Sequence, residues 1–234
     1  MPAAAPIARS DERPLDVHGF EVVPYIVPSS IRHDLLSAFD RLVGAAPGNR
    51  EGLSDPVVRA LASSPAIRHL VEPVLGASAF AYRATLFDKT PTTNWLVAWH
   101  QDIMVPVAER RDAPGYGPWS QKGGVWFVQP PVEVLRSLLA VRIDLDGSDA
   151  ANGALRVLPG THRLGVLPPA RIAELASTIA QITCAVPAGG ALLMRPLLLH
   201  ASSKAEAGTH RRVVHIEFAS EDLPGGLVFA ATTR

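Results

Sequence analysis

Two side chains with metal-binding chemistry stand two residues apart in the segment His100-Gln101-Asp102. On a β-strand, residues i and i+2 project from the same face, so this imidazole and this carboxylate can bind one cation together. A second histidine from another strand would complete a triad of two imidazoles and one carboxylate. Such a set suits iron(II), because three protein ligands occupy one face of the ion and leave the opposite face for substrates.

The same spacing occurs a second time, in His215-Ile216-Glu217. With 8 histidines and 22 acidic residues in the chain, about one such pair is expected by chance. Either pair, taken alone, is more often a surface or structural pair than a metal site. The sequence around the other histidines therefore has to distinguish the two pairs.

His200 ends an apolar strand candidate, and Arg211 opens the strand that we expect to pair with it as a hairpin. A guanidinium in this place can face a ligand that enters beside the metal. Its planar shape binds a carboxylate through two parallel hydrogen bonds, and Ser202 can donate a third. The residues near His200 thus suit a ligand bound beside a metal, and both pairs stay open as its partner at this point.

The elements that must position these side chains are mostly strands. From Phe80 onward the hydrophobic pattern has a period of two, and turn residues such as Asp146-Gly147 and Pro159-Gly160 separate short apolar runs. Gly189-Gly190 marks a further hairpin. Regularly spaced strands with Gly and Pro turns are typical of a jelly-roll sandwich or barrel. The predicted strands cover residues 140–145, 154–158, 183–186, 191–194, 197–200 and 213–219.

The first third of the chain is mainly helical. Residues 1–14 are expected to be a loose tail. Helix starts are predicted at Ser29 or Ser30, with an apolar stripe to Val43, and at the capping pairs Asp55-Pro56 and Ser64-Pro65. Residues 15–79 therefore form a helical support that ends near Gly76, and residues 168–179 form one more helix among the strands.

A long segment, residues 105–138, separates two groups of strands and is rich in Gly, Pro and aromatic residues. Connections of this length in a compact domain are usually functional or disordered, and the aromatic residues argue against disorder. We expect a lid over the site. Its candidate substrate contacts are Arg110, Arg111, Tyr116 and Trp126, although the two arginines equally fit a solvated surface and Trp126 equally fits the core.

Charge and composition exclude several classes of partner. The 22 basic and 22 acidic residues leave no net charge, which argues against nucleic acid or an anionic membrane held by bulk charge. No apolar run approaches the ~20 residues of a membrane span. The one cysteine, Cys184, excludes an internal disulfide and is expected to be a small buried residue. A cytoplasmic protein is predicted.

Three motifs occur in one order: His100-Gln101-Asp102, then Asn-Gly-Ala-Leu-Arg-Val-Leu-Pro-Gly-Thr-His-Arg at 152–163, then the spacing from His200 to Arg211. Together they resemble the phytanoyl-CoA dioxygenase family of iron(II)- and 2-oxoglutarate-dependent oxygenases, over about residues 80–218. The resemblance implies a mainly β fold with flanking helices. Its core is a double-stranded β-helix (jelly roll, cupin-like) with an N-terminal helical region, in a single domain over residues 1–234.

The resemblance also implies roles for individual residues. The implied iron ligands are His100, Asp102 and His200. The implied contacts to the cosubstrate 2-oxoglutarate are Arg211, Ser202, Lys89, Trp119 and Gln101. The alternation of side chains along a strand, however, points Gln101 away from the face that carries Asp102.

Asp102 also bears on the type of activity. In related halogenases a small residue replaces this carboxylate and frees a coordination position for halide, whereas here the carboxylate is present. The resemblance therefore implies a dioxygenase that uses O₂ to hydroxylate a small organic molecule, a metabolite or natural-product intermediate, with release of succinate and CO₂. Two alternatives remain: a jelly-roll binding protein that has lost catalysis, and a cupin-like metalloenzyme without 2-oxoglutarate.

The remaining histidines are expected to be structural. His162 holds a turn through hydrogen bonds, and His210, with Arg212, is an exposed loop residue beside Arg211. His215 and Glu217 approach the site from the opposite face as structural residues.

Overall fold

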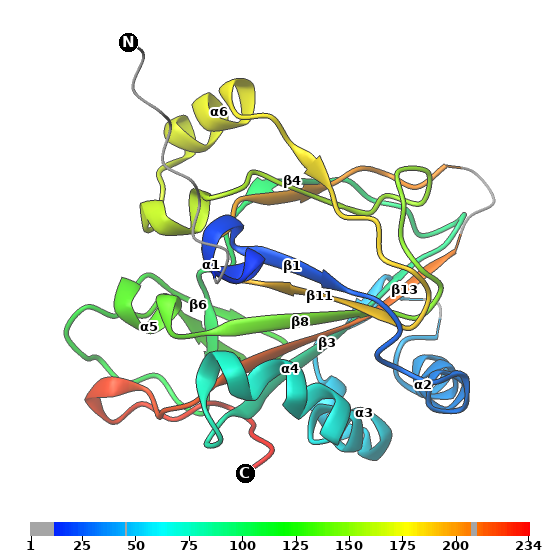
Figure 1. The fold of residues 1–234 in the computed structure, drawn as a ribbon. Coiled ribbons are helices and arrows are strands. Elements are labelled where there is room, and N and C mark those ends of the chain that lie inside the picture. The colour runs from blue at the N-terminus through cyan, green and yellow to red at the C-terminus, as the bar shows by residue number, and fades with distance from the viewer. Residues whose placement is uncertain (1–11, 45, 207–209) are drawn as a thin grey trace.

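The computed structural model describes residues 12–44, 46–206 and 210–234. Two antiparallel sheets form the centre of the molecule, and helices cover the outer face of the larger one (Figure 1). This is the mainly β architecture with flanking helices that the sequence predicts. In the described part of the chain, no helix is long and apolar enough to cross a membrane.

The larger sheet has six strands in the order β1-β11-β8-β13-β3-β2, all antiparallel. The smaller has four strands in the order β10-β9-β12-β4. The strands of the larger sheet are β1 (Phe20–Val23), β2 (Gly48–Asn49), β3 (Phe80–Lys89), β8 (Leu139–Asp144), β11 (Gly190–Met194) and β13 (Arg211–Ala219). Those of the smaller sheet are β4 (Val97–His100), β9 (Leu155–Val157), β10 (Ile182–Thr183) and β12 (His200–Ser202).

The helices follow local capping signals. Asp55 caps α3 by accepting hydrogen bonds from the backbone N–H groups of Val57 and Val58, and Ser64 caps α4, each before a proline. The predicted cap of α2 is wrong, because Pro28 takes that position and Ser29 is already helical. The helices are α1 (Pro14–His18), α2 (Ser29–Leu42), α3 (Pro56–Ala62), α4 (Pro65–Leu75), α5 (Val132–Arg136) and α6 (Pro169–Thr178), with one-turn helices η1 (Gly52–Ser54), η2 (Thr161–Leu164) and η3 (Pro224–Gly226).

The segment 105–138 forms a third, three-stranded sheet in the order β5-β7-β6, followed by α5. Its strands are β5 (Val105–Val107), β6 (Trp119–Lys122) and β7 (Val125–Val128). Val105, Val107 and Val128 are buried in a separate apolar cluster with the C-terminal residues Leu227 and Phe229. The segment thus forms an ordered substructure, and most of its aromatic residues belong to that substructure.

The two faces of the six-stranded sheet differ in chemistry. Residues of one parity, among them Leu86, Val141, Leu193, Val214 and Ile216, are buried against the helices α2 to α4. At one end, the other face packs on the four-stranded sheet through a second apolar layer. That layer contains Ala140, Leu155, Val157, Cys184, Val186, Leu192, Met194 and Leu198. Cys184 is thus buried, as predicted, and burial raises the pKa of its thiol to about 12.

Two predicted hairpins are wrong, for one reason. The chain between β10 and β11 passes from the smaller sheet to the larger, so Gly189-Gly190 does not join paired strands. Gly189 instead has a positive φ of 79° where the backbone approaches Val27 closely, and a Cβ there would lie 2.6 Å from the Val27 carbonyl oxygen. Likewise, His200 begins β12 in the smaller sheet, whereas Arg211 begins β13 in the larger.

Replacing Leu193 with alanine should destabilise the fold strongly. Leu193 is fully buried between the sheet and the helices, so we expect a loss of about 3 kcal/mol in the free energy of unfolding. Urea unfolding followed by circular dichroism measures it. The matched control is Leu96→Ala, at a site 60% exposed, which should change stability by less than about 0.5 kcal/mol. Equal effects of the two substitutions would contradict the assignment of Leu193 to the main core.

Candidate metal centre

Strand pairing brings His100, Asp102 and His200 together. His100 is the last residue of β4 and His200 the first of β12, and the two are direct cross-strand partners with ring centroids 4.1 Å apart. Asp102 follows two residues after His100, where its backbone N–H donates to the Pro196 carbonyl at 2.9 Å. One ligand atom from each of the three residues lies within 4.8 Å of the other two.

The geometry inside this cluster fits a cation better than direct hydrogen bonds. The Nε2 atoms of His100 and His200 lie 3.6 and 3.5 Å from the carboxylate oxygens of Asp102. Those separations are long for hydrogen bonds. They are near the roughly 3 Å that separates neighbouring ligands each about 2.1 Å from one ion.

Backbone carbonyls fix both imidazole rings. The Nδ1 atom of His100 lies 2.9 Å from the Ala98 carbonyl oxygen, and that of His200 lies 2.9 Å from the Leu198 carbonyl oxygen. Nδ1–H therefore donates in each ring, and Nε2 is the ring atom that faces Asp102. This is the arrangement that orients metal-binding histidines.

The protonation of Asp102 and His200 agrees with ligand chemistry. Burial lowers the pKa of the His200 imidazole to about 4, against the opposing charge of Asp102. Burial alone would raise the pKa of Asp102, but the positive charges that His200 and His100 can carry outweigh it and hold the pKa below its usual value. A neutral imidazole and an ionised carboxylate are the forms that bind metal. Asp102 in turn keeps the pKa of His100 above its ordinary value, although burial acts against this.

Beside the cluster lies a pocket of about 170 Å³ with buried cationic side chains. The pocket wall includes Arg142 and Arg211, and Lys89 donates to the Ser202 hydroxyl at 3.1 Å and to the Ser203 carbonyl at 2.6 Å. All three cations are buried. Burial, followed by repulsion between them, lowers the pKa of Lys89 to about 7 and that of Arg211 to about 10. Such a pocket favours an anionic ligand.

Arg211 has donor capacity left for that ligand. It donates through Nη1 to the Gly153 carbonyl, whereas its buried Nε has no hydrogen-bond partner in the described part of the chain. The Asn152-Gly153 motif builds this corner: Gly153 has a φ of 74°, and a Cβ there would lie 2.5 Å from the Ser203 carbonyl oxygen and 3.3 Å from Lys89 Nζ. Only glycine leaves this corner open.

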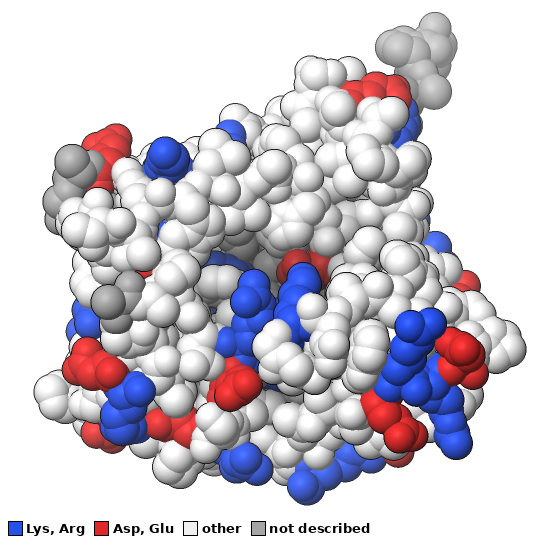
Figure 2. Space-filling view, turned by 180° about the vertical axis from the view of Figure 1, so that it is seen from behind, with Lys and Arg blue, Asp and Glu red and all other residues white. Residues whose placement is uncertain are grey.

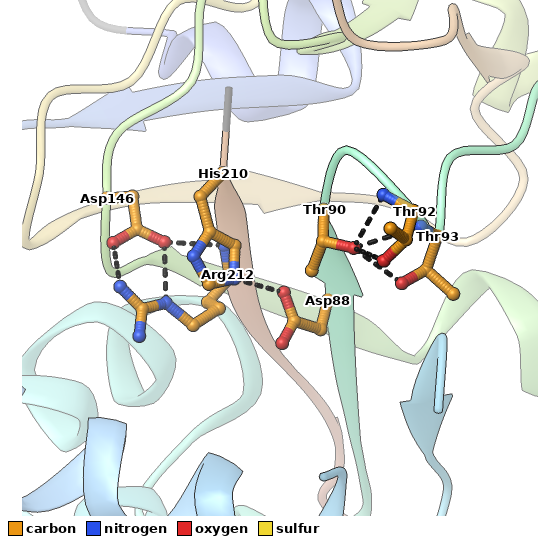
Figure 3. A network of polar contacts seen from close by, with 7 residues as sticks. All are labelled: Asp88, Thr90, Thr92, Thr93, Asp146, His210 and Arg212. Carbon is orange, nitrogen blue, oxygen red and sulfur yellow. Dashed lines mark hydrogen bonds and ion pairs between the residues drawn. The ribbon is translucent and has the colours of Figure 1, made fainter. Parts of the chain in front are cut away.

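The side chains next to Arg211 hold the strand from its other face. Arg212 binds Asp146 through two hydrogen bonds of 2.6 and 2.9 Å, and His210 Nε2 lies 2.6 Å from Asp88 Oδ1 (Figure 3). Because neighbouring residues of a strand alternate, these contacts keep Arg211 directed inward. His210 is exposed before β13, as predicted, but Arg212 is half-buried within the strand rather than in a loop.

Sequence reasoning missed much of the pocket wall. His215 and Glu217, which were expected to be structural residues on the opposite face, line the pocket with Arg83, Phe87 and Trp95. The signal was present: positions 211, 215 and 217 of β13 share one parity, as do 83, 87 and 89 of β3. Burial lowers the pKa of His215 well below its ordinary value and raises that of Glu217 to about 7, in the latter case against the charge of Arg83.

Two of the predicted cosubstrate contacts lie elsewhere. Gln101 is buried and donates to the carbonyls of Gly165 and Leu197 at 2.8 and 2.7 Å while its Oε1 accepts from the Leu167 N–H at 2.9 Å. Its amide therefore ties the loop after β4 to the rest of the fold. Trp119 packs edge-on against Trp126, with ring centroids 6.4 Å apart, and is not part of the pocket wall.

The predicted substrate contacts in the segment 105–138 are also absent from the pocket wall. Arg110 stacks on Trp119 and Trp126, with its Cζ 5.7 and 5.8 Å from the ring centroids. Arg111 donates to the Gly226 carbonyl and Tyr116 to the Pro224 carbonyl, at 3.0 and 2.9 Å. Arg111 and Tyr116 thus bind the C-terminal segment, whereas Arg110 packs within the segment 105–138. His162 was predicted to hold its own turn, but its Nε2 lies 3.3 Å from the Asp16 carbonyl oxygen, in α1, and is thus a long-range structural contact.

A jelly roll with two imidazoles and one carboxylate beside a basic pocket defines the class of non-haem metal-dependent oxygenases. The family model described as "Phytanoyl-CoA dioxygenase (PhyH)" matches residues 29–213. The chain therefore belongs to the phytanoyl-CoA dioxygenase family of iron- and 2-oxoglutarate-dependent oxygenases, and it is an oxidoreductase.

Solved structures of similar fold agree with this membership. EctD from S. alaskensis in its apoform has a TM-score of 0.69 and 18% identity, over 92% of this chain and 81% of that one. The epimerase SnoN, crystallised with Fe³⁺, alpha ketoglutarate and nogalamycin RO, has a TM-score of 0.65 and 16% identity, over 91% and 88%. HygX from Streptomyces hygroscopicus, with nickel and 2-oxoglutarate, has a TM-score of 0.63 and 16% identity, over 88% and 84%. A search of curated protein sequences finds no match.

Proposed function

We propose that this oxygenase hydroxylates a small organic molecule, with His100, Asp102 and His200 as the iron(II) ligands and 2-oxoglutarate as cosubstrate. The observation that carries the proposal is the convergence of two oriented Nε2 atoms and one carboxylate next to a buried basic pocket. SnoN and HygX, of similar fold, were crystallised with 2-oxoglutarate and a metal ion.

The donor set fits iron(II), which when bound supplies the redox chemistry that activates O₂. The overall reaction consumes one O₂ and one 2-oxoglutarate. One oxygen atom enters the hydroxyl group of the product and the other enters succinate, with release of CO₂. The protein contributes by positioning: it holds the three metal ligands, orients the cosubstrate and places the substrate next to the metal.

The basic pocket would hold the distal carboxylate of 2-oxoglutarate. Arg211 offers its unpaired Nε and the outer edge of its guanidinium, which suits two parallel hydrogen bonds. Lys89 adds a second positive charge, and its contact with Ser202 positions that hydroxyl beside the carboxylate. Both cations are buried, so little water screens their attraction.

The activity is tested directly with purified protein. Anaerobic addition of iron(II) and 2-oxoglutarate should produce the visible metal-to-ligand charge-transfer band of a chelated 2-oxo acid, and O₂ should then release succinate. A protein that binds iron without 2-oxoglutarate would instead be a metalloenzyme of another kind, and one that binds neither would be a binding protein. Structural neighbours include an epimerase and a carbocyclase, so the product is checked by mass spectrometry for one added oxygen atom.

Binding of 2-oxoglutarate should take up a proton at pH 8 and none at pH 6. Burial first, then Arg211 and Arg142, lowers the pKa of Lys89 to about 7, so at pH 8 the free protein holds this amine mostly neutral. A bound dianion favours the ammonium form and raises the pKa again, which draws about one proton from the buffer. Calorimetry in buffers of different ionisation enthalpy measures the uptake.

The variant Lys89→Met supplies the control for this linkage. It should bind 2-oxoglutarate more weakly and without the proton uptake at pH 8. If the wild-type protein shows the same proton balance at both pH values, Lys89 does not contact the cosubstrate.

A further inference from the structure

A larger cavity, of about 590 Å³, adjoins the metal pocket. The Arg83 side chain lines both, so this one side chain stands between the two spaces. The apolar part of the wall comes from Leu53, Tyr82, Val125 and Phe127. The volume is ordinary for a small-molecule site, and the position next to the metal centre is where a substrate of the proposed reaction must enter.

The charge in this wall is strongly unbalanced. Four cationic side chains line the cavity, Arg50, Arg59, Arg83 and Lys122, against the single carboxylate of Glu51. On the face of the molecule seen in Figure 2, Lys and Arg side chains lie beside a central hollow, with an acidic side chain also at its edge. The molecule as a whole has no net charge, so this imbalance is local to the cavity.

Two of these cations already have partners. The Nε of Arg83 lies 3.2 Å from Glu217 Oε2, which offsets its charge at the inner end of the cavity. Arg59 donates to the Leu53 carbonyl at 2.7 Å. By contrast, Arg50 and Lys122 are exposed, and neither forms an ion pair with a carboxylate in residues 12–44, 46–206 and 210–234. Their charges remain available to a ligand.

Ordered elements hold these two residues in the wall. Arg50 directly follows β2, where the Asn49 amide donates to the Leu42 carbonyl at 2.9 Å and accepts from the Glu51 N–H at 2.6 Å. Lys122 ends β6 beside the turn into β7, with Nζ 5.5 Å from the Phe127 ring centroid. The two cations thus come from separate sheets into one cavity that also has apolar walls.

We propose that the substrate has an apolar body ending in an anionic group, a carboxylate or a phosphate, and that Arg50 and Lys122 bind this group in the larger cavity. The inference rests on the proposed function, because it takes the metal pocket as the place of reaction. The apolar body lies against Phe127 and Val125, and the anionic end is held away from the cations that serve the cosubstrate.

Three probes of one shape test this inference: 2-naphthoate, 2-naphthyl phosphate and the neutral 2-naphthamide. Their dissociation constants are measured by calorimetry on full-length protein loaded with manganese(II) and saturating 2-oxoglutarate under nitrogen, which occupies the Arg211 pocket and prevents turnover. We expect at least one anionic probe to bind about tenfold or more tightly than the amide. The double variant Arg50→Gln/Lys122→Gln should remove this preference and leave 2-oxoglutarate binding unchanged.

The matched control is Arg136→Gln, which removes an exposed positive charge on α5, outside both cavities; it should keep the preference. Equal binding of the three probes, or no binding of any, overturns the inference, and a preference that survives in the double variant overturns the assignment of the two residues. The carboxylate and phosphate arms distinguish the two anions. Failure of 2-oxoglutarate itself to bind would instead overturn the proposed function.

Discussion

Replacing Asp102 with alanine is expected to abolish turnover of 2-oxoglutarate and to weaken iron(II) binding at least about 100-fold. The substitution removes the only carboxylate in the three-residue cluster and leaves two neutral imidazoles. Metal affinity is measured by competition with a chromogenic chelator, and turnover by succinate release. Asp102 is half-buried at a strand end, so the variant should fold, and circular dichroism verifies this.

The control for this variant is Asp112→Ala. The Asp112 side chain is 87% exposed and lies 3.8 Å from Arg110 Nε, away from the metal cluster. It should therefore keep both metal affinity and succinate release. Full metal binding and turnover in Asp102→Ala would disprove the ligand assignment.

The second large effect is expected from Arg211→Gln. Its guanidinium is buried, its Nε has no hydrogen-bond partner among the described residues, and glutamine cannot replace its charge or its fork of donors. Removing one partner of a buried charged contact should weaken 2-oxoglutarate binding about 100-fold. Iron(II) affinity should not change, because Arg211 does not belong to the metal cluster.

A 2-oxo acid without the distal carboxylate separates this role from a general loss of structure. The wild-type protein and Arg211→Gln should bind 2-oxobutanoate with similar affinity. The variant would then lose its preference for 2-oxoglutarate but keep its ability to bind a 2-oxo acid. Arg195→Gln serves as control, since Arg195 pairs with Asp16 at 3.1 Å outside the pocket. If Arg211→Gln keeps the full preference for 2-oxoglutarate, Arg211 does not bind the distal carboxylate.

Sequence reasoning predicted the elements better than their pairing. The capping pairs at 55–56 and 64–65 and the alternation in β8 and β13 depend on local chemistry, and the structure confirms them. The partner of a strand depends on the whole jelly roll, in which β10 to β13 alternate between the two sheets. For this reason the hairpins expected at Gly189-Gly190 and between His200 and Arg211 are wrong. The strand expected over residues 197–200 is also wrong, because residues 197–199 lie in the turn segment before β12 and only His200 belongs to that strand.

In the site, too, local motifs could be predicted from the sequence, whereas contacts that depend on strand pairing could not. A motif with fixed spacing, such as His100-Gln101-Asp102, could be recognised, and the structure brings it to His200. The pocket wall could not be assembled without knowing which strands are neighbours: Arg142 and Thr85 flank His215 only because β8 and β3 pair with β13 on either side. Gln101 and Trp119 lie outside the pocket because tertiary contacts, absent from the motif, fully occupy them.

The two histidines lie on the four-stranded sheet, while Arg211 and Lys89 lie on the six-stranded one. In the proposed function, 2-oxoglutarate contacts the metal on one sheet and the cationic side chains on the other. The distance between the two sheets therefore has to match the length of this acid. That gap is set by the thickness of the apolar layer that contains Leu155, Leu192 and Met194. Packed interiors transmit changes of volume. A larger or smaller side chain in this layer should therefore change the distance between the histidines and Arg211, and with it the binding of 2-oxoglutarate, although the layer itself does not contact the acid.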